Sequence, residues 1–129
     1  MLSEQTSDPP LEMLEPVTNA TGITDVIDEA TRVFVEPSLN RYVVDIVGQT
    51  RSDQRLYLGA SPRAGISLLR VAKARALADR RDYVLPDDVQ AVATAVLAHR
   101  LILGPEARAN GTPPQQLVRE AVERTPVPA

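Results

Sequence analysis

The sequence predicts an all-α fold, a small bundle of four to five helices with short extended segments between them. Two observations lead to this prediction. Apolar residues recur at helical spacing in separate stretches, and Pro and Gly residues stand between those stretches. Aromatic residues make up only 3% of the 129 residues, so the core must consist mainly of Leu, Ile, Val and Ala. A chain of this length buries roughly two-thirds of its unfolded surface, which is enough for one core of its own.

The domain organisation follows from where the Pro and Gly residues lie. Residues 1–20 contain three prolines and no sustained helical stripe, so we expect a flexible N-terminal lead-in there. The helical domain is expected over residues 21–125, and a flexible tail over residues 126–129. No apolar stretch approaches the ~18 residues that span a bilayer, and no signal peptide is recognisable. We therefore expect a cytoplasmic protein with no membrane partner.

The first helix is expected over residues 23–32. Four of its apolar residues share one face, Ile23, Val26, Ile27 and Ala30. Thr21 or Thr24 is in place to cap its N-terminus, because a Thr hydroxyl accepts a hydrogen bond from a free backbone N–H group. Asp25 and Asp28 suit the positive end of the helix dipole.

Two β-favouring runs flank the second helix. Residues 33–35 read Val-Phe-Val and stop before Pro37, and residues 56–58 read Leu-Tyr-Leu. The helix between them is expected at about residues 38–51. Its apolar face has nearly ideal helical spacing and holds Leu39, Tyr42, Val43, Ile46 and Val47.

The third helix is the longest and is expected from Pro62 to about Arg80. Ser61 occupies the N-cap position and Pro62 the first helical position, and both are favoured start signals. The core face of this helix holds Gly65, Leu68, Leu69, Ala72 and Ala76. A Gly inside a helix costs about 1 kcal/mol relative to Ala, which indicates close packing against a neighbouring helix.

Two more helices complete the bundle. After an extended run at residues 83–85, the apolar spacing predicts a fourth helix at about residues 87–98 and a fifth at about residues 114–124. We expect Tyr83 and Val84 to pack the extended run against the bundle.

Familiar active-site motifs are absent from the sequence. A phosphate-binding loop of the GxxxxGK[ST] type needs Gly followed by Lys, and the single lysine, Lys73, follows Ala72. With no Cys and one His, the composition excludes thiol chemistry and multi-His metal sites. Asp87 and Asp88 look like a carboxylate pair, but their place in a first helical turn favours a structural role. We therefore expect no metal site and no activity from the chain alone.

Residues 59–63, Gly-Ala-Ser-Pro-Arg, are the strongest candidate for a binding site. Arg63 falls in the first turn of a long helix, where the dipole is positive and acidic residues are preferred. That placement costs a few tenths of a kcal/mol, up to about 1 kcal/mol, unless an anion is bound there. Free backbone N–H groups and the guanidinium would then both point at the anion. A solvated arginine at a helix start is the simpler alternative.

The stretch of residues 58–101 resembles the C-terminal helical lid of MoxR-type AAA+ ATPases. The ordered motifs that carry the resemblance are LGASPRAG, DYVLPDDV and HRL. The likeness continues upstream through VFVEPSLNRYVVDIVGQTR and, more weakly, covers about residues 20–125. In that family the arginine of GASPR is the sensor 2 arginine, which reaches the γ-phosphate of the nucleotide, so the resemblance implies a catalytic role for Arg63. It also implies a nucleotide-binding role for the rest of the motif, Gly59, Ala60, Ser61 and Pro62.

The resemblance further implies features of a larger enzyme. The Walker A and Walker B elements, sensor 1 and the arginine finger of the family lie in an N-terminal αβα ATPase domain, so we expect this chain to be a lid cut from a longer ATPase. ATP with Mg²⁺ is the expected cofactor of that full-length enzyme, with none held tightly by the lid. A ring-shaped oligomer, a chaperone-like role and partners with von Willebrand factor A domains are further implications.

A free-standing helical interaction or nucleic-acid-binding module is the alternative. A long helix, a short extended run and another helix also resemble histone-like folds. Arg70, Lys73 and Arg81 lie toward the same side of the third helix as Arg63, and such a basic stripe would meet phosphates or a neighbouring domain. A solvated face explains the stripe equally well. The net charge of −3 at pH 7 argues against nucleic acid, since affinity for phosphate backbones depends mainly on positive charge.

Overall fold

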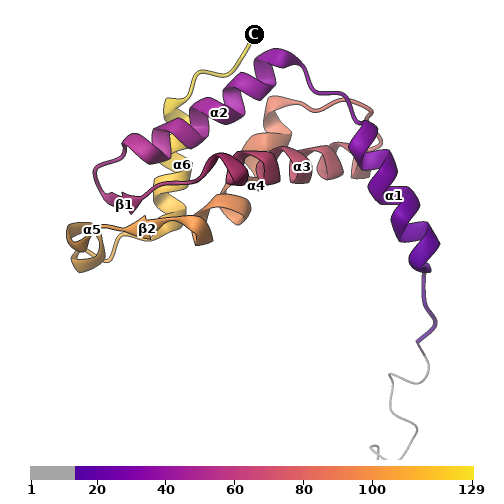
Figure 1. The fold of residues 1–129 in the computed structure, drawn as a ribbon, viewed down its shortest axis with the longest axis horizontal. Coiled ribbons are helices and arrows are strands. Elements are labelled where there is room, and N and C mark those ends of the chain that lie inside the picture. The colour runs from indigo at the N-terminus through magenta and orange to yellow at the C-terminus, as the bar shows by residue number, and fades with distance from the viewer. Residues whose placement is uncertain (1–13) are drawn as a thin grey trace, which may run out of the picture.

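The structure is a computed structural model that describes residues 14–129, and most of the expected N-terminal lead-in lies outside the described residues. Within them the fold is all-α, as the sequence predicts (Figure 1). In chain order the elements are α1 (Ala20–Arg32), α2 (Pro37–Ser52), β1 (Leu56–Leu58), α3 (Pro62–Ala78), α4 (Pro86–Leu97), the 3₁₀ turn η2 (Ala98–Arg100), β2 (Ile102–Leu103), α5 (Pro105–Ala109) and α6 (Pro114–Arg124). None of the helices in this part of the chain is long and apolar enough to cross a bilayer.

The core lies between α2, α3, α4 and α6, with α3 in contact with α1, α2 and α4. Many core residues have no exposed surface; they are Ile46, Ala64, Leu68, Ala72, Ala76, Val89, Ala93, Leu97, Val118 and Ala121. The alanines of α3 let the neighbouring helices approach closely. Gly65 does the same toward α2, because a Cβ atom there would lie 3.4 Å from Val47 and 3.5 Å from Val43. The close packing expected at this glycine is therefore confirmed.

Helix α1 differs from the prediction at its start and on its apolar face. It begins at Ala20 rather than at residue 23, because the side chain of Asn19 accepts a hydrogen bond from the Gly22 N–H at 2.9 Å and forms the N-cap. The predicted caps, Thr21 and Thr24, are wrong, since both lie inside the helix. No acidic residue falls in the first turn, and no residue of α1 is buried.

Two features of the C-terminal region also differ from the prediction. The Gly104-Pro105 step interrupts the chain as expected, but Pro105 then starts the short helix α5, with Gly104 as its N-cap residue. Thr125 is buried and donates a hydrogen bond to the Ala121 carbonyl at 2.7 Å, so the chain is held up to that residue. The flexible tail at residues 126–129 stays a prediction.

The three predicted extended runs find partners far away in the sequence. Phe34 pairs with Tyr83 in a parallel bridge, in which the Phe34 N–H donates to the Asp82 carbonyl at 2.7 Å. Strand β1 pairs antiparallel with β2. Val84 is buried as expected, whereas Tyr83 is 47% exposed, so it packs against the bundle only in part.

Helix α3 ends at Ala78, two residues earlier than expected, in a Schellman motif. The Arg81 N–H donates to the Ala76 carbonyl at 2.9 Å and the Arg80 N–H to the Leu77 carbonyl at 2.8 Å. This closure places Arg80 in the left-handed region, with a φ of 59°. A side chain with a Cβ atom is strained there, whereas glycine is not.

We expect Arg80→Gly to stabilise the folded chain by about 0.5–1 kcal/mol, because it removes this strain while part of the gain is offset by the greater entropy of the unfolded chain. Urea unfolding followed by circular dichroism measures the change. The matched control is Arg70→Gly, which replaces an exposed arginine in the helical part of α3 and should destabilise the chain. A loss of stability in Arg80→Gly would contradict the strain argument.

Candidate functional site

Residues 59–63 form the turn that leads from β1 into α3. Ser61 is the N-cap of α3, and its hydroxyl accepts a hydrogen bond from the Ala64 N–H at 3.3 Å. Pro62 is the first helical residue, so the predicted start of this helix is confirmed. The local sequence therefore fixes the position of the next residue, Arg63, within the first turn.

Arg63 lies exposed at the positive end of α3, and the first turn of the helix contains no acidic residue. Within residues 14–129 no ion pair holds its guanidinium, in contrast to Arg75 and Arg81 near the other end of the helix. The side chain is thus available to an anion from outside the domain. An arginine in the first turn of a helix is unfavourable unless an anion binds there, so the sequence also indicates a guanidinium that is open to an anion.

The turn before Arg63 is fastened to the end of α2 through Thr50. The Thr50 hydroxyl, 1% exposed, accepts a hydrogen bond from the Ala60 N–H at 2.9 Å and donates one to the Val47 carbonyl at 2.7 Å. Gly59 makes this close approach possible, because a Cβ atom there would lie 2.5 Å from the Thr50 carbonyl oxygen. Thr50 was not predicted from the sequence, although a polar residue at a core-facing position of α2 is a usable signal.

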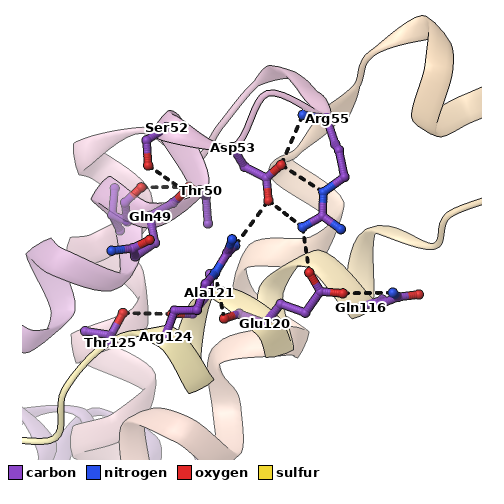
Figure 2. A network of polar contacts seen from close by, with 11 residues as sticks. Gln49, Thr50, Ser52, Asp53, Arg55, Gln116, Glu120, Ala121, Arg124 and Thr125 are labelled. Carbon is purple, nitrogen blue, oxygen red and sulfur yellow. Dashed lines mark hydrogen bonds and ion pairs between the residues drawn. The ribbon is translucent and has the colours of Figure 1, made fainter.

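A second polar network holds the chain where it leaves α2 (Figure 2). The Asp53 carboxylate accepts hydrogen bonds from the Arg55 backbone N–H at 3.0 Å and from the Arg55 guanidinium at 3.0 and 2.8 Å. From α6, Arg124 reaches Asp53 at 3.2 Å and Glu120 binds Arg55. The hydrogen bonds from Arg55 hold the pKa of Asp53 well below its usual value and also lower the pKa of Glu120. The connector to residues 59–63 is therefore anchored to α6.

The two adjacent aspartates of α4 lie in different surroundings. Asp88 is 2% exposed and accepts hydrogen bonds from both terminal nitrogens of Arg81 at 2.7 Å and from the Leu85 N–H at 2.8 Å. The Arg75 guanidinium lies 3.5 Å away. The adjacent Arg81 guanidinium, more than any other group, lowers the pKa of Asp88. Asp87 is exposed, so the pair cannot work as one carboxylate site, and the structural role predicted for both is confirmed for Asp88.

The expected basic stripe of α3 is only half present. Arg81 turns to Asp88, and the Lys73 ammonium donates a hydrogen bond to the Thr31 carbonyl at 2.8 Å, so these two cations hold the domain together. Arg63 and Arg70 stay exposed on the outer face of the helix. Across the described residues no cluster of three His, Asp or Glu side chains is arranged to hold a metal ion.

Two hollows flank the turn at residues 59–61. One, of about 390 Å³, is lined by this turn, by the three residues of β1 and by Arg51 and Arg100. The other, of about 330 Å³, is an apolar groove between α2 and α3 that begins beside Pro62. Arg51 lines both hollows, which therefore lie next to each other beside the N-terminus of α3.

Comparison with known proteins gives a consistent set of matches. Residues 48–121 match the family model of the AAA lid domain. The chain is 40% identical over 128 residues to the uncharacterized protein YeaC of Bacillus subtilis (strain 168), which covers 99% of this chain and 40% of YeaC. It is 35% identical over 108 residues to Chaperone MoxR1 of Mycobacterium tuberculosis, covering 77% of this chain and 29% of that protein.

A solved structure shares the fold as well as the sequence. The crystal structure of a protein from Cytophaga hutchinsonii described as an ATPase aligns with a TM-score of 0.73 at 34% identity. The alignment covers 79% of this chain and 34% of that one. The chain thus spans well under half the length of each of these three proteins.

Proposed function

Since the chain belongs to the AAA lid domain family and is a lid of the MoxR type of AAA+ ATPase, we propose that it senses the nucleotide of such an ATPase through Arg63, as its sensor 2 arginine. The observation that supports the proposal is the place of Arg63. It is an exposed guanidinium at the positive end of a 17-residue helix, with no acidic partner among residues 14–129. A bound polyphosphate supplies the negative charge that this position favours.

In the proposed mechanism Arg63 reaches from the lid to the γ-phosphate of ATP. Its guanidinium neutralises charge that develops on the γ-phosphoryl group during hydrolysis. Gly59 and Ala60 place the turn against α2, and Ser61 with Pro62 starts the helix, so all four residues position Arg63. When hydrolysis removes the γ-phosphoryl group, Arg63 loses its partner, and the angle between lid and ATPase domain changes.

The rest of the enzyme is part of the proposal. An αβα ATPase domain supplies the Walker A and Walker B elements and the ligands of Mg²⁺, for which the described residues offer no cluster. A ring-shaped oligomer, a cytoplasmic location, a chaperone-like role and partners with von Willebrand factor A domains are expectations from the resemblance. Of the relatives, the Mycobacterium protein carries the name chaperone. The nucleic-acid alternative is not proposed, because Lys73 and Arg81 are engaged inside the domain.

The test uses a joined protein, in which this chain replaces the matching 128-residue segment of Bacillus subtilis YeaC. We expect Arg63→Ala to weaken binding of ATPγS about tenfold, the effect of losing one charge-assisted hydrogen bond. ADP should bind within about twofold of its original affinity, because it has no γ-phosphate for Arg63 to contact. Isothermal titration calorimetry measures both nucleotides.

Arg119→Ala, which removes an exposed arginine of α6, is the matched control and should change neither affinity. An equal loss of affinity for ATPγS and for ADP would show that Arg63 does not contact the γ-phosphate. Failure of the joined protein to bind either nucleotide would contradict the lid function itself.

A further inference from the structure

Thr50 places a buried hydroxyl in the last turn of α2. The buried face of this helix is otherwise apolar except for Tyr42. A buried hydroxyl costs free energy unless it is hydrogen-bonded. The Thr50 hydroxyl donates to the Val47 carbonyl of its own helix and accepts from the Ala60 N–H, ten residues further along the chain. A valine side chain has nearly the same shape and would fill this place in the core, so the contact with Ala60 is what the threonine adds.

This contact acts on the first turn of α3. Ala60 precedes Ser61, the N-cap of the helix, and Arg63 follows two residues after that cap. The ring of Pro62 fixes its φ, and the Ser61 hydroxyl is held by the hydrogen bond that it accepts from the Ala64 N–H. Few free dihedral angles therefore separate the Ala60 backbone from the Cα atom of Arg63, and a shift of Ala60 moves Arg63 with it.

Packing and hydrogen bonding hold the turn in different ways. Gly59 lies against the backbone of α2, where a Cβ atom would lie 2.5 Å from the Thr50 carbonyl oxygen and 2.7 Å from the Arg51 Cα atom. Such packing sets how near the turn comes, but it has little directionality. The hydrogen bond from the Ala60 N–H to Thr50 is directional, and within residues 14–129 the Ala60 backbone makes no other. Thr50 therefore determines where along the end of α2 the turn lies.

We propose that Thr50 is a positioning residue for Arg63, and that its hydroxyl sets how strongly the lid distinguishes ATP from ADP. The inference rests on the proposed function, since the distinction is made at the γ-phosphate that Arg63 is proposed to contact. A charge-assisted hydrogen bond from a guanidinium depends on both distance and angle. A displacement of the turn by about 1 Å is enough to weaken it, although the charge of Arg63 is still present.

Isothermal titration calorimetry of the joined protein with YeaC tests the proposal. We expect Thr50→Val to weaken binding of ATPγS about fivefold, less than Arg63→Ala because the guanidinium remains, and to leave ADP binding within about twofold. Thr50→Ala also removes the hydroxyl and should behave like Thr50→Val. Thr50→Ser keeps the hydroxyl and should bind ATPγS within about twofold of the original.

Thr125→Val is the matched control. It removes another buried threonine hydroxyl, one that donates to the Ala121 carbonyl in the last turn of α6 and makes no contact with residues 59–63. This variant should change neither affinity. If it weakens ATPγS binding as much as Thr50→Val does, the loss reflects general destabilisation and the inference is wrong.

Combination with Arg63→Ala separates positioning from a general structural role. Because Thr50 acts through Arg63, Thr50→Val should weaken ATPγS binding no further in a protein that already carries Arg63→Ala. A further loss of about fivefold there would mean that Thr50 affects the nucleotide by another route. An equal loss for ATPγS and ADP in Thr50→Val alone, or a Thr50→Ser variant as weak as Thr50→Val, would also overturn the inference.

Hydrogen exchange of the 129-residue chain tests the positioning without nucleotide. The Ala64 N–H donates to Ser61 and reports on the first turn of α3, whereas the Leu97 N–H in the buried part of α4 reports unfolding of the whole domain. Thr50→Val should speed exchange at Ala64 at least about fivefold more than at Leu97, and equal changes at the two amides would overturn the inference. If Arg63→Ala binds ATPγS like the original, the proposed function fails; if Arg63→Ala loses affinity and Thr50→Val does not, the inference alone fails.

Discussion

Replacing Arg63 by Ala in the joined protein should lower its ATP turnover number about a hundredfold, the size of effect seen when one preorganised cation or hydrogen-bond donor to a transition state is removed. This expectation follows from the proposed function, in which the guanidinium of Arg63 neutralises charge that develops on the γ-phosphoryl group. Arg63→Lys should retain part of the activity, because an ammonium keeps the charge but lacks the bidentate geometry. Steady-state phosphate release at saturating ATP measures the three proteins.

The control for this prediction is again Arg119→Ala, which should leave turnover within about twofold. The thermal midpoint of the isolated Arg63→Ala chain should be equal to that of the original or slightly higher, because the side chain is exposed, has no ion pair within residues 14–129 and lies at the unfavourable end of the helix dipole. Normal turnover in Arg63→Ala would show that the residue takes no part in hydrolysis.

Asp88→Ala should have the largest effect on stability, a loss of about 2–3 kcal/mol in the free energy of unfolding. The substitution removes a buried carboxylate that binds Arg81 and Arg75 and accepts the hydrogen bond of the Leu85 N–H. The N-terminal contact of α4 alone accounts for about 1 kcal/mol of this loss. Urea unfolding at neutral pH measures it.

Asp87→Ala is a closely matched control, because it removes the same group from the neighbouring exposed position and should cost less than about 0.5 kcal/mol. The effect of Asp88 also depends on pH. Its pKa is lowered in the folded state, so its contribution is present above the unfolded pKa of about 3.9 and is lost as pH falls through the folded value. The stability curves of the original chain and Asp88→Ala should therefore converge as pH falls below about 4. Parallel curves down to the lowest pH would contradict the role of the ionised carboxylate.

Most of the helices could be predicted from the sequence because the signals that start them act between residues close together in the chain. Ser61 and Pro62 mark the start of α3 by capping and by a fixed φ, both of which act within a few residues. The apolar face of α2, including Tyr42 and Ile46, is buried as its spacing predicts. Arg63 could be identified from the sequence for a similar reason. A cation in the first turn is unfavourable with the helix dipole, so it is recognisable from the neighbouring residues alone.

The remaining features depend on partners distant in the sequence. The pairing of Leu56 with Leu103 joins residues that no local pattern connects. Likewise Asp53 has its partner Arg124 on α6. Spacing also predicts which face of α1 is apolar but not whether the domain covers it.

The contact between Thr50 and Ala60 has a mechanical consequence. A single buried hydroxyl joins the last turn of α2 to the residues that lead into α3. Because this hydroxyl bonds to both segments, the last turn of α2 and the start of α3 are held next to each other. We therefore expect a movement of the start of α3 to displace the end of α2 as well, and the contact between Arg124 and Asp53 joins α6 to that same end.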